Sequence, residues 1–197
     1  MGKTINVKNL YLSEITEGES ELTFGKPEIV PGLRKATRKP TISKGVQYGD
    51  GKLDDIESSK TSYEIAMDHN DIPQKWRAWF EGLSITNGVE SGSSGDKAKP
   101  FAMGWEIEKT KGVRELIWFI YCKANPIEDT DEQREDNIKI SNDTVTITAF
   151  EHESVGRYYT KINSKNEEVT DKMLQDFFTK VQTTDTIGTP EAAGTLE

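Results

Sequence analysis

The residue types that most often carry catalysis or bind metals are few and scattered in this sequence. The two histidines, His69 and His152, each have an acidic neighbour, and the single cysteine, Cys122, lies inside the apolar run LIWFIYCK. Two histidines and one cysteine do not provide the ligand spacing of a tetrahedral zinc site. We therefore expect no metal and no cofactor, and we predict that Cys122 is a small core residue rather than a nucleophile.

The carboxylate-rich segments offer two further kinds of chemistry, and neither fits well. Adjacent Asp54 and Asp55 point to opposite sides of an extended chain, which is a poor arrangement for paired acid–base catalysis. The run DTDEQREDN resembles a calcium loop, but Arg134 stands where an EF-hand needs glycine. The sequence contains no glycine-rich phosphate loop and no G-x-S-x-G motif. It therefore predicts that the chain is not an enzyme.

Composition narrows the class of protein further. The 197 residues suffice for one domain with a core, 34% of them are hydrophobic, and the net charge is -9. Proteins that grip DNA neutralise phosphates with Lys and Arg, so this acidic balance argues against a sequence-reading DNA protein. A single cysteine permits no internal disulfide, as is typical of a reducing compartment. We expect neither a signal peptide nor a membrane span, because no apolar run is long enough.

Alternating patterns predict a mainly β chain. We expect strands at residues 5–15, 33–43, 59–68, 140–150 and 155–162, and a hairpin over residues 101–122 that turns at Lys111-Gly112. Its second strand, from Leu116 to Cys122, is apolar on both faces and should be the most buried. The Gly- and Ser-rich residues 84–99 are predicted to form a loop. Residues 44–58 form a polar run far longer than the two to five residues of a tight hairpin loop.

Two segments have helical spacing. Residues 71–83, DIPQKWRAWFEGL, carry a plausible N-cap at Asp71, a proline suited to the first turn and Gly82 at the end. The second segment, residues 169–182, can be capped by Thr170 or Asp171. Residues 183–197 are poor in large apolar groups and are predicted to be a disordered tail. The apolar face of the first helix, which should pack on a sheet, comprises Trp76, Trp79, Phe80 and Leu83.

Five of these segments, in this order and spacing, resemble a known family. They are LYLSEI with LTFGKPEIVPGL, the run containing YGDG, MDHNDIP before a helix, PFAMGWEIEKTKGVRELIWFIYCKAN, and the closing LQDFFTKV. Together they resemble the major tail (tail tube) proteins of long-tailed bacteriophages and prophages of Gram-positive bacteria. The resemblance covers about residues 5–182. The heavy basic cluster near residue 35 and the long loop 84–99 depart from the family pattern.

The resemblance implies a fold and an assembly. The fold would be mainly β with minor α (α+β), a tail-tube β-sandwich or barrel with one packed helix, a long stacking loop and a short C-terminal helix, in one tail-tube domain of residues 1–182. Six copies would form each ring, and stacked rings would form a tube whose lumen conducts DNA during genome ejection. Closing sheets of six subunits into one barrel would also remove their edges, which are otherwise an aggregation hazard.

The same resemblance implies partners, a location and site residues. The partners would be other copies, the tape measure protein, double-stranded DNA without sequence preference, and the tail terminator and tail-tip proteins, with no membrane binding. The chain would be assembled in the host bacterial cytoplasm and reside in the virion tail. An inter-ring arm at residues 44–58 would use Lys44, Tyr48, Asp50, Lys52, Asp54, Asp55 and Glu57. The basic interface that receives it would be Arg34, Lys35, Arg38 and Lys39. The lumen would be faced by Ser62, Glu64, Asp68, Thr144, Thr146 and Thr148.

Several alternatives remain open from the sequence. The leading alternative among assemblies is the tube protein of a contractile tail or of a secretion-type injection machine, which shares the ring architecture. A soluble β-sandwich that binds a ligand such as carbohydrate would use exposed aromatic residues, for which Tyr48, Tyr158 and Tyr159 are available. An enzyme is a third alternative, weakened by the lack of a catalytic constellation. Residues 44–58 would be a disordered surface loop if they are not an arm.

Overall fold

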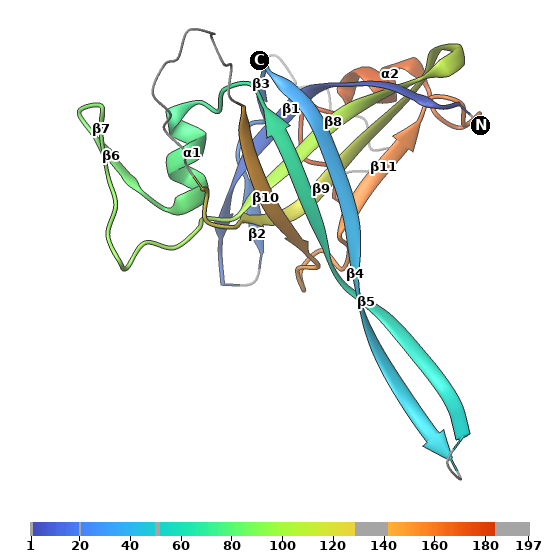
Figure 1. The fold of residues 1–197 in the computed structure, drawn as a ribbon. Helices are drawn as coiled ribbons and strands as arrows, with labels where there is room; N and C mark the ends of the chain where they lie inside the picture. The colour runs from blue at the N-terminus through green and yellow to red at the C-terminus, as the bar shows by residue number, and fades with distance from the viewer. Residues whose placement is uncertain (1, 20, 50–51, 129–141, 184–197) are drawn as a thin grey trace, which may run out of the picture.

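The protein is mainly β, as the sequence predicts. The computed structural model describes residues 2–19, 21–49, 52–128 and 142–183, and for residues 45–57 within these ranges it describes the course of the backbone. They form one large antiparallel sheet, a small two-stranded sheet and two short helices (Figure 1). Within these ranges the large sheet does not close into a barrel.

The large sheet follows the order β2-β1-β8-β9-β10-β5-β4, with β3 attached to β1 and β11 attached to β9. The first strand and the 101–122 hairpin match the sequence prediction closely. The strands are β1 (Thr4–Glu17), β2 (Leu22–Phe24), β3 (Glu28–Val30), β4 (Leu33–Gly49), β5 (Lys52–His69), β6 (Ser84–Thr86), β7 (Val89–Ser91), β8 (Phe101–Lys109), β9 (Val113–Ala124), β10 (Asp143–Phe150) and β11 (Tyr159–Asn163).

The centre of the molecule is the hairpin of β8 and β9. All residues of β9 from Leu116 to Cys122 are buried, which confirms the prediction made from their continuous apolar run. On one face Trp105 stacks on Phe119, with ring centroids 5.6 Å apart, inside the larger core cluster. On the opposite face Trp118 belongs to a second cluster that is closed by the C-terminal segment. A strand with both faces covered needs apolar residues at successive positions, and β9 has them.

Helix α1 (Gln74–Glu81) covers the larger cluster, and it begins later than the sequence predicts. Asp71 is not the N-cap, because the chain before the helix is tied to the sheet. The backbone N–H of Asp71 donates to Nδ1 of His69 at 3.2 Å, and that of Ile72 donates to Oδ2 of Asp143 at 2.8 Å. The helix therefore starts after Pro73, which occupies the N-cap without a side-chain hydrogen bond.

The end of α1 and its packing face agree with the sequence. Gly82 adopts a left-handed conformation at the C-cap, with φ 78°. Trp76 and Phe80 are buried in the core. Trp79 is half-buried and donates from Nε1 to the carbonyl oxygen of Pro100 at 3.0 Å, and Leu83 is also half-buried.

Helix α2 (Asp171–Asp176) seals the second cluster. The hydroxyl of Thr170 accepts from the backbone N–H of Met173 at 3.3 Å, so the predicted cap is confirmed. Beyond the helix, Phe178 stacks on Tyr11 with ring centroids 4.3 Å apart. The indole of Trp118 donates to the carbonyl oxygen of Phe177 at 3.0 Å, which fixes this segment on β9.

Other predictions need correction or lie outside the described residues. Residues 84–99 are not all loop, since β6 and β7 form a small hairpin there that projects beside α1 (Figure 1). Turn chemistry explains it, because Asn87 and Gly88 both have positive φ. The strand expected at residues 155–162 begins only at Tyr159. The calcium-like run at residues 129–137 and the C-terminal tail from residue 184 lie outside the described residues.

Candidate assembly surface

The polar run at residues 44–58 is part of a long β-ribbon rather than a loop. β4 and β5 pair from Leu33↔His69 at one end to Gly49↔Lys52 at the other. A register shift after Gln47 places Tyr48 opposite Leu53. Such a bulge adds one residue to one strand, so the apolar residues beyond it no longer keep the every-second-residue spacing of the residues before it. The alternation typical of a strand is therefore not visible in the sequence. The predicted stacking loop is therefore a two-stranded hairpin.

The outer part of this ribbon stands clear of the body, as Figure 1 shows. β10 pairs with β5 from Asp143↔His69 only as far as Ala149↔Tyr63, so beyond Tyr63 the ladder on β5 continues with β4 alone. We call the projecting residues 41–49 and 52–62 the arm; its base lies a few residues closer to the body than the predicted 44–58. Lys44 lies on it, together with the backbone at Tyr48, Lys52, Asp54, Asp55 and Glu57. Asp50 lies outside the described residues.

The strands β10, β5 and β4 share one polar face in the body. On β10 and β5, Thr144 lies opposite Asp68 and Thr148 opposite Glu64. The hydroxyl of Thr144 donates to Oδ1 of Asp68 at 3.2 Å. Thr146 and Ser62 occupy the same face by alternation. The structure thus places the six residues predicted to face a lumen on one face. The opposite face is core, where Tyr63, Ile65, Met67, Val145 and Ile147 are buried.

The basic residues of β4 are divided between both sides of the sheet. Lys35 lies opposite Asp68 and Lys39 opposite Glu64, so both lysines belong to the polar face. Directly opposed residues have Cβ atoms about 4.5–5.5 Å apart, close enough for opposite charges to attract. Arg38 lies opposite Ile65 and is half-buried on the core side, while Arg34 is exposed at a register shift. The four residues predicted as one basic interface therefore do not form one patch.

β4 is also the last strand of the sheet. Within the described ranges it pairs only with β5, so the other edge of β4 carries N–H and C=O groups that no strand of the same chain satisfies. From Lys35 to Lys39 its side chains alternate between exposed lysine or threonine on the polar face and half-buried Ala36 and Arg38 on the core side. A long strand edge of this kind is a template for pairing with another chain.

The cysteine and the two histidines lie in different local surroundings. Cys122 is fully buried, and burial raises the pKa of its thiol. His69 is buried at the end of β5 against Gly32, where a Cβ would come 2.8 Å from the histidine Cε1. His152 lies beside the ring of Tyr121 and within hydrogen-bond distance of Ser154. In the part of the chain that the structure describes, no group of three or more His, Cys, Asp or Glu residues is arranged to hold a metal.

The aromatic residues of the ligand-binding alternative are engaged in packing. Tyr158 and Tyr159 each contact the ring of Tyr63, with centroids 5.6 Å apart in both cases. The hydroxyl of Tyr158 donates to the carbonyl oxygen of Lys60 at 2.9 Å, at the base of the arm. The side chain of Tyr48 lies outside the described residues. Tyr158 thus supports the base of the arm, while Tyr159 packs on Tyr63 and remains 38% exposed.

A charged network at the far end of the β8–β9 hairpin was not predicted. Glu115 is buried, and its Oε1 accepts from Nζ of Lys109 at 2.6 Å and from Nδ2 of Asn163 at 2.9 Å. Burial alone would raise the pKa of Glu115, but the hydrogen bond from Lys109 and the charge of Lys161 outweigh it and lower that pKa. The charged sequence EKTKGVRE around the turn was the available signal, since it contrasts with the apolar strands on both sides.

Comparison with known proteins adds no assignment. No protein-family model and no curated protein sequence matches the chain. Among the described residues, neither α1 nor α2 has the length and apolar character needed to cross a bilayer.

Proposed function

We propose that this chain is the major subunit of a phage tail tube, forming hexameric rings that stack into a hollow tube through which DNA passes. The observation that carries the proposal is the β4–β5 ribbon. It combines a polar face, an unpaired edge and an arm that projects from the body. The proposal places the chain in the virion tail, with other copies, the tape measure protein and the proteins at the two tail ends as partners.

The unpaired edge of β4 favours a closed assembly. Neighbouring subunits satisfy such an edge when their sheets join into one barrel, which leaves no edge exposed. If β4, β5, β10 and the end of β9 contribute four strands per subunit, six subunits give a barrel of roughly 24 strands. At about 4.8 Å per strand, its backbone diameter is roughly 35–50 Å, enough for one DNA duplex.

The polar face is suited to a lumen that does not hold DNA. Threonine hydroxyls line β10, while the carboxylates of Glu64 and Asp68 lie opposite Lys39 and Lys35. Because lysines and carboxylates alternate across this face, it offers little net positive potential for phosphates, and DNA is gripped mainly through phosphate neutralisation. Changing Glu64 and Asp68 to lysine should therefore slow genome ejection without preventing assembly. Ejection at the normal rate in such particles would count against this assignment of the lumen.

Electron microscopy of the purified chain tests the assembly itself. The intact protein should form rings or tubes at high concentration. A variant lacking residues 47–57 should keep its fold but fail to form long tubes. The matched control lacks residues 85–90, which removes the tip of the other exposed hairpin, and should assemble normally. An intact chain that stays monomeric under all conditions, or tubes of normal length without residues 47–57, would overturn the proposal.

A further inference from the structure

The turn between β6 and β7 contains the one asparagine that precedes a glycine in this sequence. Asn87 and Gly88 have φ angles of 54° and 80°, and Thr86 pairs with Val89 across them. Two central residues with positive φ make the tight hairpin turn for which Asn-Gly is a preferred pair. The turn chemistry that forms this hairpin therefore also sets an amide side chain directly beside a backbone nitrogen that no Cβ hinders.

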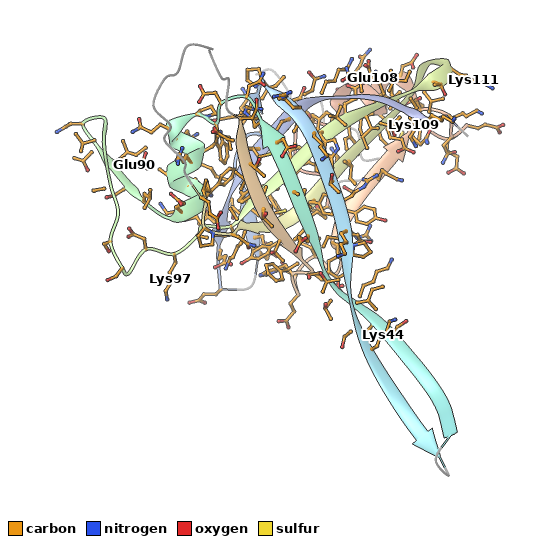
Figure 2. All side chains as sticks on the ribbon, viewed as in Figure 1. Lys44, Glu90, Lys97, Glu108, Lys109 and Lys111 are labelled. Atoms are coloured by element: carbon orange, nitrogen blue, oxygen red, sulfur yellow. The ribbon has the colours of Figure 1, made fainter. Side chains whose placement is uncertain are left out.

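Both residues of the turn are open to solvent. Asn87 and Gly88 are exposed, and a Cβ on Gly88 would meet no atom outside its two neighbouring residues within 4 Å. Figure 2 shows Glu90, a residue of β7, on the hairpin that projects from the body. Among the described residues, the side chain of Asn87 and the N–H of Gly88 have no hydrogen-bond partner. Nothing in the described part of the chain thus holds the amide in place.

The hairpin that carries the turn has little to hold it closed. It comprises three residue pairs and forms a sheet of its own. Ile85 and Val89 are 41% and 66% exposed, so the hairpin buries little apolar surface. A short two-stranded hairpin is marginally stable in water, and such segments open locally at a small cost in free energy. Asn87 can therefore leave its folded backbone conformation without unfolding of the body.

Asn163, in contrast, is held on both sides of its amide. Its Nδ2 donates to Oε1 of Glu115 at 2.9 Å, and its Oδ1 accepts from the backbone N–H of Lys165 at 2.9 Å. The backbone nitrogen that follows it, in Ser164, donates to the carbonyl oxygen of Arg114 at 2.9 Å. The amide and the neighbouring nitrogen are both engaged here, which makes this position an internal reference for the turn.

We propose that Asn87 is a site of spontaneous deamidation, through which the folded protein gains a negative charge. The backbone nitrogen of Gly88 gives its proton to base and attacks Cγ of Asn87, so that a new N–C bond forms. The bond from Cγ to the amide nitrogen breaks, and ammonia leaves with a proton from water. Water then opens the resulting succinimide at either carbonyl carbon, which gives aspartate or isoaspartate. The reaction needs water alone, and the inference stands independently of the proposed function.

The two products differ in what they do to the hairpin. Asp-Gly is itself a preferred pair for this turn, so the aspartate form should keep the pairing of Thr86 with Val89. Isoaspartate inserts a methylene group into the backbone and lengthens a loop of two residues, so this pairing should be lost. Either product adds one negative charge to the net charge of -9, on the hairpin that already carries Glu90.

Peptide mapping by mass spectrometry provides the test. The folded chain is incubated in mildly alkaline buffer and then digested with trypsin. In the peptide of residues 78–97, Asn87 is the only amide side chain, so the acid form of that peptide reports on this site alone. It should accumulate at least about tenfold faster than the acid form of residues 162–165, which contain Asn163. The rate should fall in mildly acidic buffer, where less of the attacking nitrogen is deprotonated.

The matched variant is Asn87→Gly, because Gly-Gly also suits this turn and carries no amide. Its peptide of residues 78–97 should show no acid form, and its melting temperature should match that of the intact chain. Unfolding in urea should accelerate Asn163 more than Asn87, since Asn163 then loses the hydrogen bonds that hold it. No acid form in the intact chain, equal rates at the two sites in the folded chain, or a larger acceleration of Asn87 in urea would overturn the proposal.

Discussion

The two long hairpins of this protein contrast in how completely they are covered. In the β8–β9 hairpin both faces are buried, and both outer edges pair with other strands. In the β4–β5 hairpin only one face meets the core, the edge of β4 is unpaired within the described ranges, and the arm leaves the body. Within the described ranges, the first hairpin is covered by other strands and by the two core clusters, whereas the second leaves a polar face and one strand edge uncovered.

The contrast separates folding from assembly. A two-stranded ribbon alone is marginally stable in water, so the arm cannot contribute much to the stability of an isolated subunit. Burial of large apolar side chains dominates stability, and those side chains are concentrated in and around β8 and β9. Changes in the two hairpins should therefore affect different measurements.

Truncation of Trp118 should have the largest effect. Its ring is fully buried and its indole N–H donates to Phe177, so Trp118→Ala should lower the free energy of unfolding by about 3–5 kcal/mol. Ile42→Ala, at the base of the arm where 49% of the side chain is exposed, should cost less than about 1 kcal/mol. Urea denaturation measures both, and similar costs would break the comparison between the hairpins.

A methyl group at Gly104 should have the next largest effect. A Cβ there would lie 2.7 Å from the carbonyl oxygen of Ile117 and 2.9 Å from Cε1 of Phe178. Gly104→Ala should therefore lower the free energy of unfolding by about 1–3 kcal/mol through overpacking. At Gly25 the nearest atom would be 3.5 Å away, so Gly25→Ala serves as the control. A Gly104→Ala protein as stable as this control would show that the core hairpin tolerates expansion.

Acid should weaken the far end of the core hairpin by a smaller amount. The pKa of Glu115 is lowered from 4.5 in the folded state, so its stabilising effect is present above about pH 4.5 and is lost as pH falls through the lower native value. The intact chain should be more stable than Glu115→Gln at pH 7, and the difference should shrink below pH 4. Melting both proteins across this range measures it. A constant difference would mean that the Lys109 pairing does not depend on the charge of Glu115.

Shortening the arm should have the smallest effect on the isolated subunit. Deletion of residues 47–57 removes backbone pairing that involves only β4 and β5. We expect the free energy of unfolding of the monomer to change by no more than about 0.5 kcal/mol, in contrast to its effect on tube length. Denaturation at a protein concentration below that of assembly tests this expectation. A large loss of stability would mean that the arm also supports the body.

The well-predicted parts are those where one local signal is sufficient. The apolar run of β9 has no other stable place than the interior, and Thr170 and Gly82 have the chemistry of helix ends. The mainly β class followed from the same patterns. The grouping of threonines and carboxylates on one face was also predictable, because the positions alternate regularly in both β5 and β10.

The less predictable parts depend on register. Bulges in the ribbon hid the outer halves of β4 and β5, which were expected to be a loop. The faces of Arg34, Lys35, Arg38 and Lys39 could not be read from the sequence, because a shift of one residue moves every side chain to the other face. The charged network around Glu115 joins β8, β9 and β11, and no pattern within one segment reveals such a junction.

The strands that project as the arm are the same β4 and β5 that belong to the sheet of the body, with one register shift where the arm begins. From Thr41 to Gly49 the ribbon extends roughly 30 Å at about 3.3 Å per residue. The arm is therefore attached to the body at one end only, through β5, which pairs with β10 there. A sideways force on its tip would act on β4 and β5 at this attachment. In the proposed tube, an arm that is also held at its tip by another molecule would resist bending and twisting of the tube.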